Sequence, residues 1–186
     1  AIGYNSMLAN TTGTRNVAVG ANALDANTVG AKNVALGMDA LGANVDGSRS
    51  VAVGDSALAS QDPASASDMY NTAVGHGAGA SVTTGINNTL IGGLAGDALT
   101  DADSNTAIGY NTLTTNTVAS ACTAVGSGAL YFHNVTSAAQ TFNTAVGYDA
   151  GNQVTTGIKN TLIGGIAGDA LNTGSYNVAV GMQALS

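Results

Sequence analysis

The stretch from Asn71 to Leu99, NTAVGHGAGASVTTGINNTLIGGLAGDAL, returns at Asn143 to Leu171 as NTAVGYDAGNQVTTGIKNTLIGGIAGDAL. Of the 29 aligned residues, 23 are identical. Inside each stretch a shorter unit recurs: Asn-Thr-Ala-Val-Gly, then two variable positions and a small residue. A chain that repeats itself on this scale folds as stacked copies of one structural unit.

The short unit occurs eleven times when its copies are aligned on the glycine. Successive copies are separated by a short step of 17 residues or a long step of 21 residues. The aligned glycines, which we call the anchor glycines, are Gly3, Gly20, Gly37, Gly54, Gly75, Gly92, Gly109, Gly126, Gly147, Gly164 and Gly181. Three short steps and one long step together equal the offset between the two long stretches. We therefore predict that residues 1–186 form a single repeat array, an excerpt of a longer fibre, and not separate globular domains.

The composition limits how such an array can bury its residues. Aromatic residues make up 4% of the chain and charged residues 8%, while glycine occurs 26 times. Burial must therefore come from many small apolar residues, which fits the hydrophobic content of 45%. The net charge of −7 and the four basic residues argue against nucleic-acid binding. No apolar run approaches membrane-spanning length, so we expect no membrane contact by this segment.

The residues before each anchor glycine predict a short β-strand. The residue just before it is Val, Ile or Leu, the second is Ala or Leu, and the third is Val or Thr. Strand alternation places the β-branched residues on one face and the Ala and Gly residues on the other. We expect the β-branched face to point inward as a continuous apolar column. The bare Ala and Gly face would then be covered by another copy of the chain, which predicts a homotrimer.

Other positions of the unit complete one coil of a parallel, all-β roll. Asn usually stands four positions before the anchor glycine, and stacking at about 4.8 Å would align these residues in an amide ladder. We read the residues after the anchor glycine as a second short strand. Six further glycines, each seven positions before an anchor, are expected to permit a positive φ in a turn: Gly13, Gly30, Gly47, Gly85, Gly157 and Gly174. Eleven coils would span roughly 50 Å.

Several units carry a family resemblance. NVAVG at 16–20, SVAVG at 50–54 and NTAIG at 105–109 resemble the head repeats of YadA-type trimeric autotransporter adhesins. Units with Thr-Gly before the Asn and Ala-Leu after the glycine are similar to repeat arrays of phage tail fibres. The resemblance covers essentially the whole chain. It implies a left-handed parallel β-roll (a β-solenoid), three rolls about one axis, and a function in reaching or gripping a surface.

The sequence offers no catalytic or metal-binding constellation. His76 and His133 stand without a second ligand at metal spacing, and no Ser-His-Asp or Cys-His set can be assembled. Asp97, Asp101 and Asp103 would suit calcium, although we favour solvated turn acids. Cys122 takes an Asn position of the ladder, where a small buried thiol fits. We expect no enzyme activity, no cofactor and no metal.

Two features are candidates for surface contact. The two long steps carry longer loops, 59–69 and 131–141, and the second loop brings rings into a chain that has few. Aromatic side chains commonly anchor binding patches. The candidate contact residues are Tyr131, Phe132, His133 and Phe142, with packing onto the roll or onto a neighbouring subunit as the alternative that we favour. All four basic residues precede ladder positions, which predicts an outward stripe along the coils.

These observations favour a structural segment of an extracellular trimeric fibre. Near-identical blocks suit a rigid spacer and display surface, because selection for one binding site gives no reason to duplicate every coil. The favoured hypothesis is a phage tail fibre of a virion. Its expected partners are other fibre or virion components and a cell-surface glycan or protein receptor. The alternative is a bacterial surface adhesin head that itself binds host or matrix. An ice-binding or matrix solenoid ranks third, because the Thr rows are expected to point inward.

Overall fold

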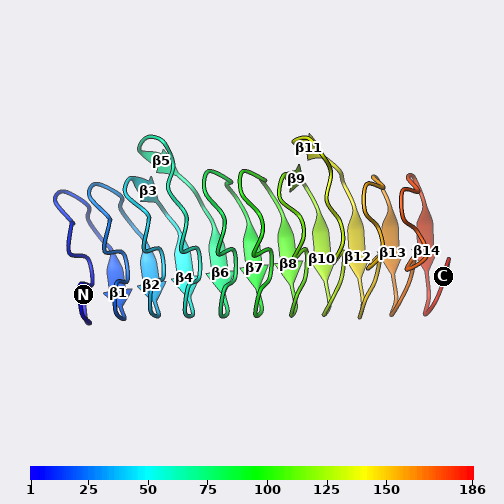
Figure 1. Ribbon diagram of the computed structural model, residues 1–186, viewed down its shortest axis with the longest axis horizontal. Helices are drawn as coiled ribbons and strands as arrows, with labels where there is room; N and C mark the ends of the chain where they lie inside the picture. The colour runs from blue at the N-terminus through cyan, green and yellow to red at the C-terminus, as the bar shows by residue number, and fades with distance from the viewer.

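The computed structural model describes residues 1–186 as a straight stack of coils with parallel strands and no helix. The chain enters at one end of the stack and leaves at the other (Figure 1). The predicted all-β, parallel β-solenoid is confirmed.

One three-residue strand from each coil contributes to a single ten-stranded sheet. Its strands, in order along the stack, are β1 (Val17–Val19), β2 (Val34–Leu36), β4 (Val51–Val53), β6 (Thr72–Val74), β7 (Thr89–Ile91), β8 (Thr106–Ile108), β10 (Thr123–Val125), β12 (Thr144–Val146), β13 (Thr161–Ile163) and β14 (Val178–Val180). Equivalent residues pair directly, as Ala124 does with Ala107 and Ala145. An isolated bridge from Ile2 to Val19 adds the first unit to the sheet.

The predicted second strand after each anchor glycine is wrong. That segment is a turn in which the second and fourth residues after the glycine adopt left-handed conformations, as Asn22 and Leu24 do at φ 55° and 51°. The turns still stack by backbone hydrogen bonds between coils, such as Leu24 N–H to Ala40 O at 3.1 Å. Each coil therefore satisfies its backbone through its neighbours even where it has no strand.

The anchor glycines are required by both conformation and space. Their φ angles lie between 126° and 142°, a region that L side chains rarely adopt. A Cβ on Gly20 would overlap the carbonyl oxygen of Gly37 in the next coil. Gly30 and its equivalents do not have the positive φ that we expected. They are small because a Cβ on Gly30 would overlap the carbonyl oxygen of Gly47.

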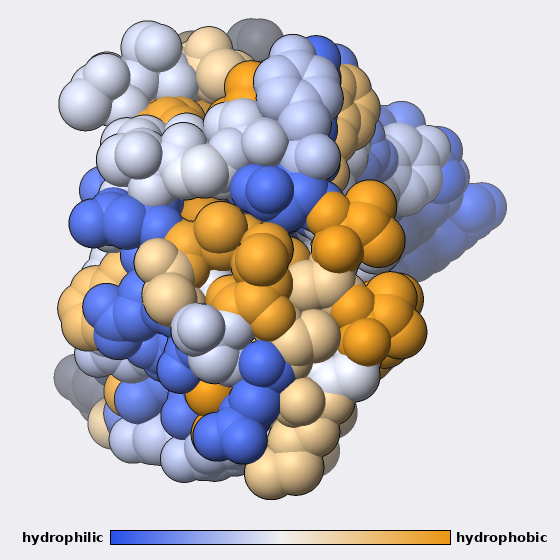
Figure 2. All heavy atoms as spheres, turned by 90° about the vertical axis from the view of Figure 1, so that its right-hand side faces the viewer, coloured by the Kyte–Doolittle hydropathy of each residue, from blue (hydrophilic) through white to orange (hydrophobic).

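The orientation of the strand faces is the reverse of our prediction. Ala18, Ala52 and Ala124 are buried at the centre of their strands, whereas flanking residues such as Val74 and Ile91 are each 37% exposed. The central strand position holds only Ala or, in two coils, Leu, because other side chains take up most of the small interior of the coil. The β-branched residues are left on the outer face, and Figure 2 shows hydrophobic surface both in the middle of the C-terminal end and along one side.

Leucines from the turns fill the rest of the core. Leu24, Leu41, Leu58, Leu113 and Leu130 reach inward from left-handed positions and are fully buried. In four coils this turn position is glycine, and the space is filled by a strand leucine, Leu90 or Leu162, together with Val82, Leu99 or Val154. The coils thus use two alternative ways to fill one small cross-section.

The predicted amide ladder is confirmed. The Oδ1 of a ladder asparagine accepts the backbone N–H of the ladder residue in the next coil, at 2.8–3.0 Å, as from Asn33 to Asn16. Its Nδ2 donates to the backbone carbonyl of the residue fourteen positions further along the chain, at 2.7–3.1 Å, as from Asn33 to Gly47. Each asparagine therefore joins two coils, and the ladder is broken only where Ser50 and Cys122 replace it.

The long loops of the two long steps are also present. Each loop projects from the stack and contains one short strand that pairs in parallel with a strand of the preceding coil: β5 (Ser67–Asp68) with β3 (Gly47–Ser48), and β11 (Ala139–Gln140) with β9 (Ala119–Ser120) (Figure 1). The main sheet continues past both loops without a change of register.

Candidate functional site

The four candidate contact residues lie in three different places. Tyr131 is half-buried and packs edge-to-face on Phe132, with ring centroids 4.6 Å apart. His133 turns inward and is fully buried. Phe142 is 51% exposed and belongs to the stripe of residues that precede the ladder positions. The packing that we favoured is therefore right for His133, whereas Phe132 and Phe142 remain on the surface.

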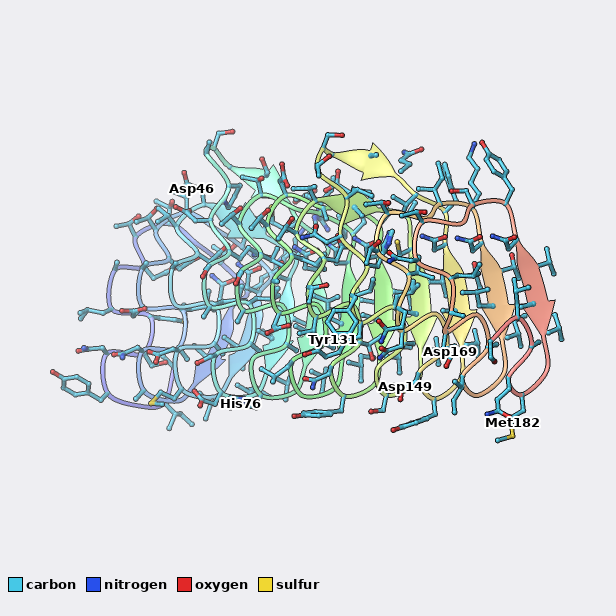
Figure 3. All side chains as sticks on the ribbon, turned by 45° about the vertical axis from the view of Figure 1, so that its right-hand side comes forward. Asp46, His76, Tyr131, Asp149, Asp169 and Met182 are labelled. Carbon is cyan, nitrogen blue, oxygen red and sulfur yellow. The ribbon has the colours of Figure 1, made fainter.

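Tyr131 and Phe132 line an open groove of about 300 Å³ on the turn side of three consecutive coils. Its lining residues are Tyr110, Asn111, Ser127, Gly128, Tyr131, Phe132, Tyr148, Asp149 and Asn152. Tyr131 and Asp149 can be located on this side in Figure 3. We did not predict the groove from the sequence. The signal was that Tyr110 and Tyr148 both directly follow anchor glycines two coils apart, which places them in one row.

Coil stacking holds the groove in shape. The backbone N–H of Phe132 donates to the Asn152 carbonyl at 3.1 Å, so the aromatic turn is fixed to the next coil. Asn152 Nδ2 donates to Asp149 Oδ1 and to the Gly128 carbonyl, both at 3.2 Å. Asp149 raises the pKa of the Tyr148 phenol, first through a hydrogen bond and second through its negative charge. The groove thus combines aromatic surface with amide, hydroxyl and carboxylate groups.

A second cluster lies inside the stack. His133 Nε2 is 3.2 Å from Thr141 Oγ1 and 3.3 Å from Asn143 Nδ2, and Thr141 Oγ1 is 2.9 Å from Cys122 Sγ. Burial lowers the pKa of His133 to about 4, and the nearby Thr155 backbone works in the opposite direction. Burial also raises the pKa of Cys122 to about 11. A neutral thiol and a neutral imidazole without access to solvent have a packing role.

The stripe of basic residues forms contacts of its own. Arg49 pairs with Asp68 at 2.8 Å and lies 5.5 Å from the ring centroid of Tyr70. Lys159 lies 4.9 Å from the ring centroid of Tyr176 and donates to its hydroxyl at 3.2 Å. These cations stack on rings of the following coil, so the stripe includes exposed contacts between neighbouring coils.

No protein-family model, curated protein or solved structure matches the chain. The structure brings no three His, Cys or Asp residues together in a way that could hold a metal ion. It also contains no helix that is long and apolar enough to cross a membrane.

Proposed function

We propose that this chain is the repeat segment of an extracellular trimeric fibre, where it acts as a rigid spacer and display surface. A phage tail fibre is the first choice of owner and a bacterial surface adhesin the second. The coils would form a left-handed roll, as in the resembling families, with three copies about one axis. The role is structural and not enzymatic.

One observation carries this proposal: the outer face of the ten-stranded sheet is a continuous row of β-branched residues. Its twenty positions are Val, Thr or Ile, apart from Leu36, and none is charged. The row runs over ten strands, which is roughly 45 Å at the usual strand spacing. Six of these positions are Thr, but every strand also contributes Val, Ile or Leu, and a long uncharged strip of this kind is typical of an interface.

The strip suits contact with further copies of the same chain. Equivalent residues repeat in register along it, so a symmetry-related strip offers the same spacing and could interdigitate over its whole length. This revises the trimer interface that we expected from the sequence, because the small Ala residues are inside the coil and are not available to a partner.

Sedimentation provides the test. The wild-type chain should be a trimer at micromolar concentration, and Val125→Asp, in the middle of the strip, should give a folded monomer. The matched control is Gln153→Asp, which adds the same charge at an exposed turn position and should leave the trimer intact. A wild-type monomer, or a trimer that tolerates Val125→Asp, would contradict this interface.

One observation favours a second function. Thr72, Thr89 and Thr106 begin a row of six outward threonines at successive strands, beside a row of Val and Ile. This overturns our reason for ranking an ice-binding solenoid low, which was that the threonines would point inward. A flat face with regularly spaced Thr and Val side chains could order water molecules, as an ice-binding surface must. A monomer that shows thermal hysteresis, lost on Thr106→Lys, would favour ice binding over the fibre.

A further inference from the structure

The groove beside Tyr131 results from an interruption in a second side-chain ladder. The second residue after each anchor glycine faces this side of the stack, and in the first coils these residues join up: Asn5 Nδ2 donates to Asn22 Oδ1 at 3.4 Å, and Asn22 Nδ2 to Asp39 Oδ1 at 2.9 Å. Farther along, Ser56, Leu94 and Ile166 break the row of amides and carboxylates, and at Gly77 and Gly128 it has no side chain. Of these two gaps, only the one at Gly128 has an amide or a carboxylate on each side, Asn111 before it and Asp149 after it.

The interruption leaves hydrogen-bonding capacity unused. Asn111 lines the groove and is half-buried, and its Nδ2 makes no hydrogen bond within the chain, so this amide group is the one it offers to a ligand; its Oδ1 is closed to solvent and has no partner. Asp149 lines the groove and accepts from Asn152 and from the Tyr148 hydroxyl, and a carboxylate has about four acceptor positions, so it can accept further hydrogen bonds. Gly128 is also needed for the shape, since a Cβ there would overlap Asp149 Oδ1.

Aromatic rings enclose the same gap. Tyr110 and Tyr148 lie two coils apart, with the small Ser127 between them, and Tyr131 and Phe132 form the side. Tyr110 and Tyr148 are 58% and 62% exposed. Such rings offer flat apolar surface beside polar groups, which is the usual character of a ligand site.

The dimensions suit one small ring with polar substituents. Residues two coils apart are separated by about 9.6 Å. Two hydrogen bonds of about 2.8 Å leave roughly 4 Å, the size of a six-membered ring. The groove volume of about 300 Å³ is at the lower end of the range for ligand pockets.

The charges around the groove indicate which kind of ring it would bind. No basic residue lines the groove, Asp149 contributes a carboxylate, and the chain carries a net charge of −7. Anionic ligands are therefore disfavoured. A neutral sugar has an apolar face for the tyrosines and hydroxyl groups that can donate to Asp149 and bond to the Asn111 amide.

We propose that this groove binds a neutral hexopyranose unit of a glycan, with Tyr110, Tyr148 and Phe132 contacting the ring and Asn111 and Asp149 bonding its hydroxyl groups. The site depends on neither the trimer nor the spacer role. A single open site of this size should bind with a dissociation constant on the order of millimolar.

Saturation-transfer NMR on the full chain tests the proposal, with methyl glycosides of glucose, galactose, mannose and N-acetylglucosamine as probes. At least one should show transfer, and Ser127→Phe, which fills the groove, should remove it. Ala21→Phe is the matched control, since Ala21 also directly follows an anchor glycine but has no aromatic turn beside it. Tyr148→Ala should weaken binding at least fivefold, whereas the equivalent Tyr4→Ala should not.

Three results would overturn the proposal. The first is an absence of transfer to all four neutral glycosides. The second is transfer that survives Ser127→Phe unchanged. The third is stronger transfer to methyl glucuronide, an anionic sugar, than to any neutral one. None of these results depends on the sedimentation behaviour of the chain, so the sugar site and the fibre can fail separately.

Discussion

Gln61 and His133 are 72 residues apart and occupy equivalent positions in two successive blocks, each made of three short steps and one long step. Both close the same break in the amide ladder, Gln61 ahead of Gly75 and His133 ahead of Gly147. Both are fully buried. Gln61 Oε1 accepts from Ser50 at 3.1 Å and from Asn71 at 2.9 Å, and its Nε2 donates to Asn44 at 3.0 Å. His133 replaces only part of this network: its Nε2 lies 3.3 Å from Asn143 Nδ2, but it makes no hydrogen bond to Asn116, the equivalent of Asn44. The second block therefore contains a titratable group where the first has a neutral amide.

Acid should destabilise the second block through His133. The pKa of His133 is lowered from 6.5 to about 4, so the folded chain keeps the ring neutral while the unfolded chain takes up a proton below pH 6.5. The stability that comes from the neutral ring is present above pH 6.5 and is lost as the pH falls towards 4. The loss should reach about 3 kcal/mol per chain.

The two blocks supply their own controls for this prediction. His133→Gln should make the free energy of unfolding less dependent on pH between 6.5 and 4, measured by chemical denaturation at each pH. Gln61→His should make that dependence steeper by introducing the same group into the first block. If neither variant changes the slope, His133 is not the acid-sensitive group.

The two ways of filling the core should show strong coupling between Leu90 and Gly96. A Cβ on Gly96 would lie 2.8 Å from Leu90 Cδ2, so Gly96→Leu alone overfills the coil. Leu90→Ala alone leaves a cavity and should cost about 2–5 kcal/mol. Together they restore the strand alanine and turn leucine of the other coils. Leu99, whose Cδ1 would lie 2.8 Å from the same Cβ, remains where those coils have a polar residue such as Asn44, so some overfilling should persist. Thermal unfolding of the double variant should show a loss well below the sum of the single losses.

The face of the strand should decide what an added charge does. Ala124 is fully buried, so Ala124→Asp places an unpaired carboxylate in a space that holds only a methyl group, and we expect a loss of several kcal/mol that unfolds the coil. Val125→Asp, at the next position, points outward and should leave the circular dichroism spectrum of the β-solenoid unchanged. Equal disruption by both variants would mean that the outer face is as confined as the inner one.

The sequence was sufficient to predict the period, the strand before each anchor glycine and the ladder, because each of these depends on residues that recur at fixed spacing. It was not sufficient to orient the strand. Alternation separates Ala124 from Val125 but does not say which is inside, and the usual preference for burying the larger residue fails because leucines from the turns already occupy the interior of the coil. The left-handed turns, which bring Leu24 and its equivalents inside, had a signal that we did not use: in four coils the equivalent position is glycine, the usual marker of that conformation.

Only part of the candidate site could be predicted from the sequence, because some of its residues meet only when coils stack. Tyr131 and Phe132 are neighbours in sequence and stay together in the structure. Tyr110 and Tyr148 join them only through stacking, and they become visible when residues are compared down a row of equivalent positions. The direction of His133 could have been inferred from Gln61, its equivalent in the first block.

Deleting the segment 72–143 should shorten the stack without unfolding it. The deletion removes one complete block and joins Asn71 to Thr144, which restores the native Asn-Thr-Ala-Val-Gly unit. The new neighbours, β4 and β12, should pair in the register that β4 now forms with β6, and Gln61 should bond to the same ladder asparagine as before. Four coils are lost, so the length should fall by about 19 Å. Small-angle scattering would measure the change in length.

The control for this deletion is a shorter one, 72–133, which joins Asn71 to Asn134 and leaves the remaining units out of phase. The ladder asparagine would then be followed by a loop segment in place of a strand, so the coils on the two sides of the junction could not pair in register. We expect this variant to lose cooperative thermal unfolding. A stack that is indifferent to the phase of the deletion would contradict the coil-by-coil coupling on which a rigid spacer depends.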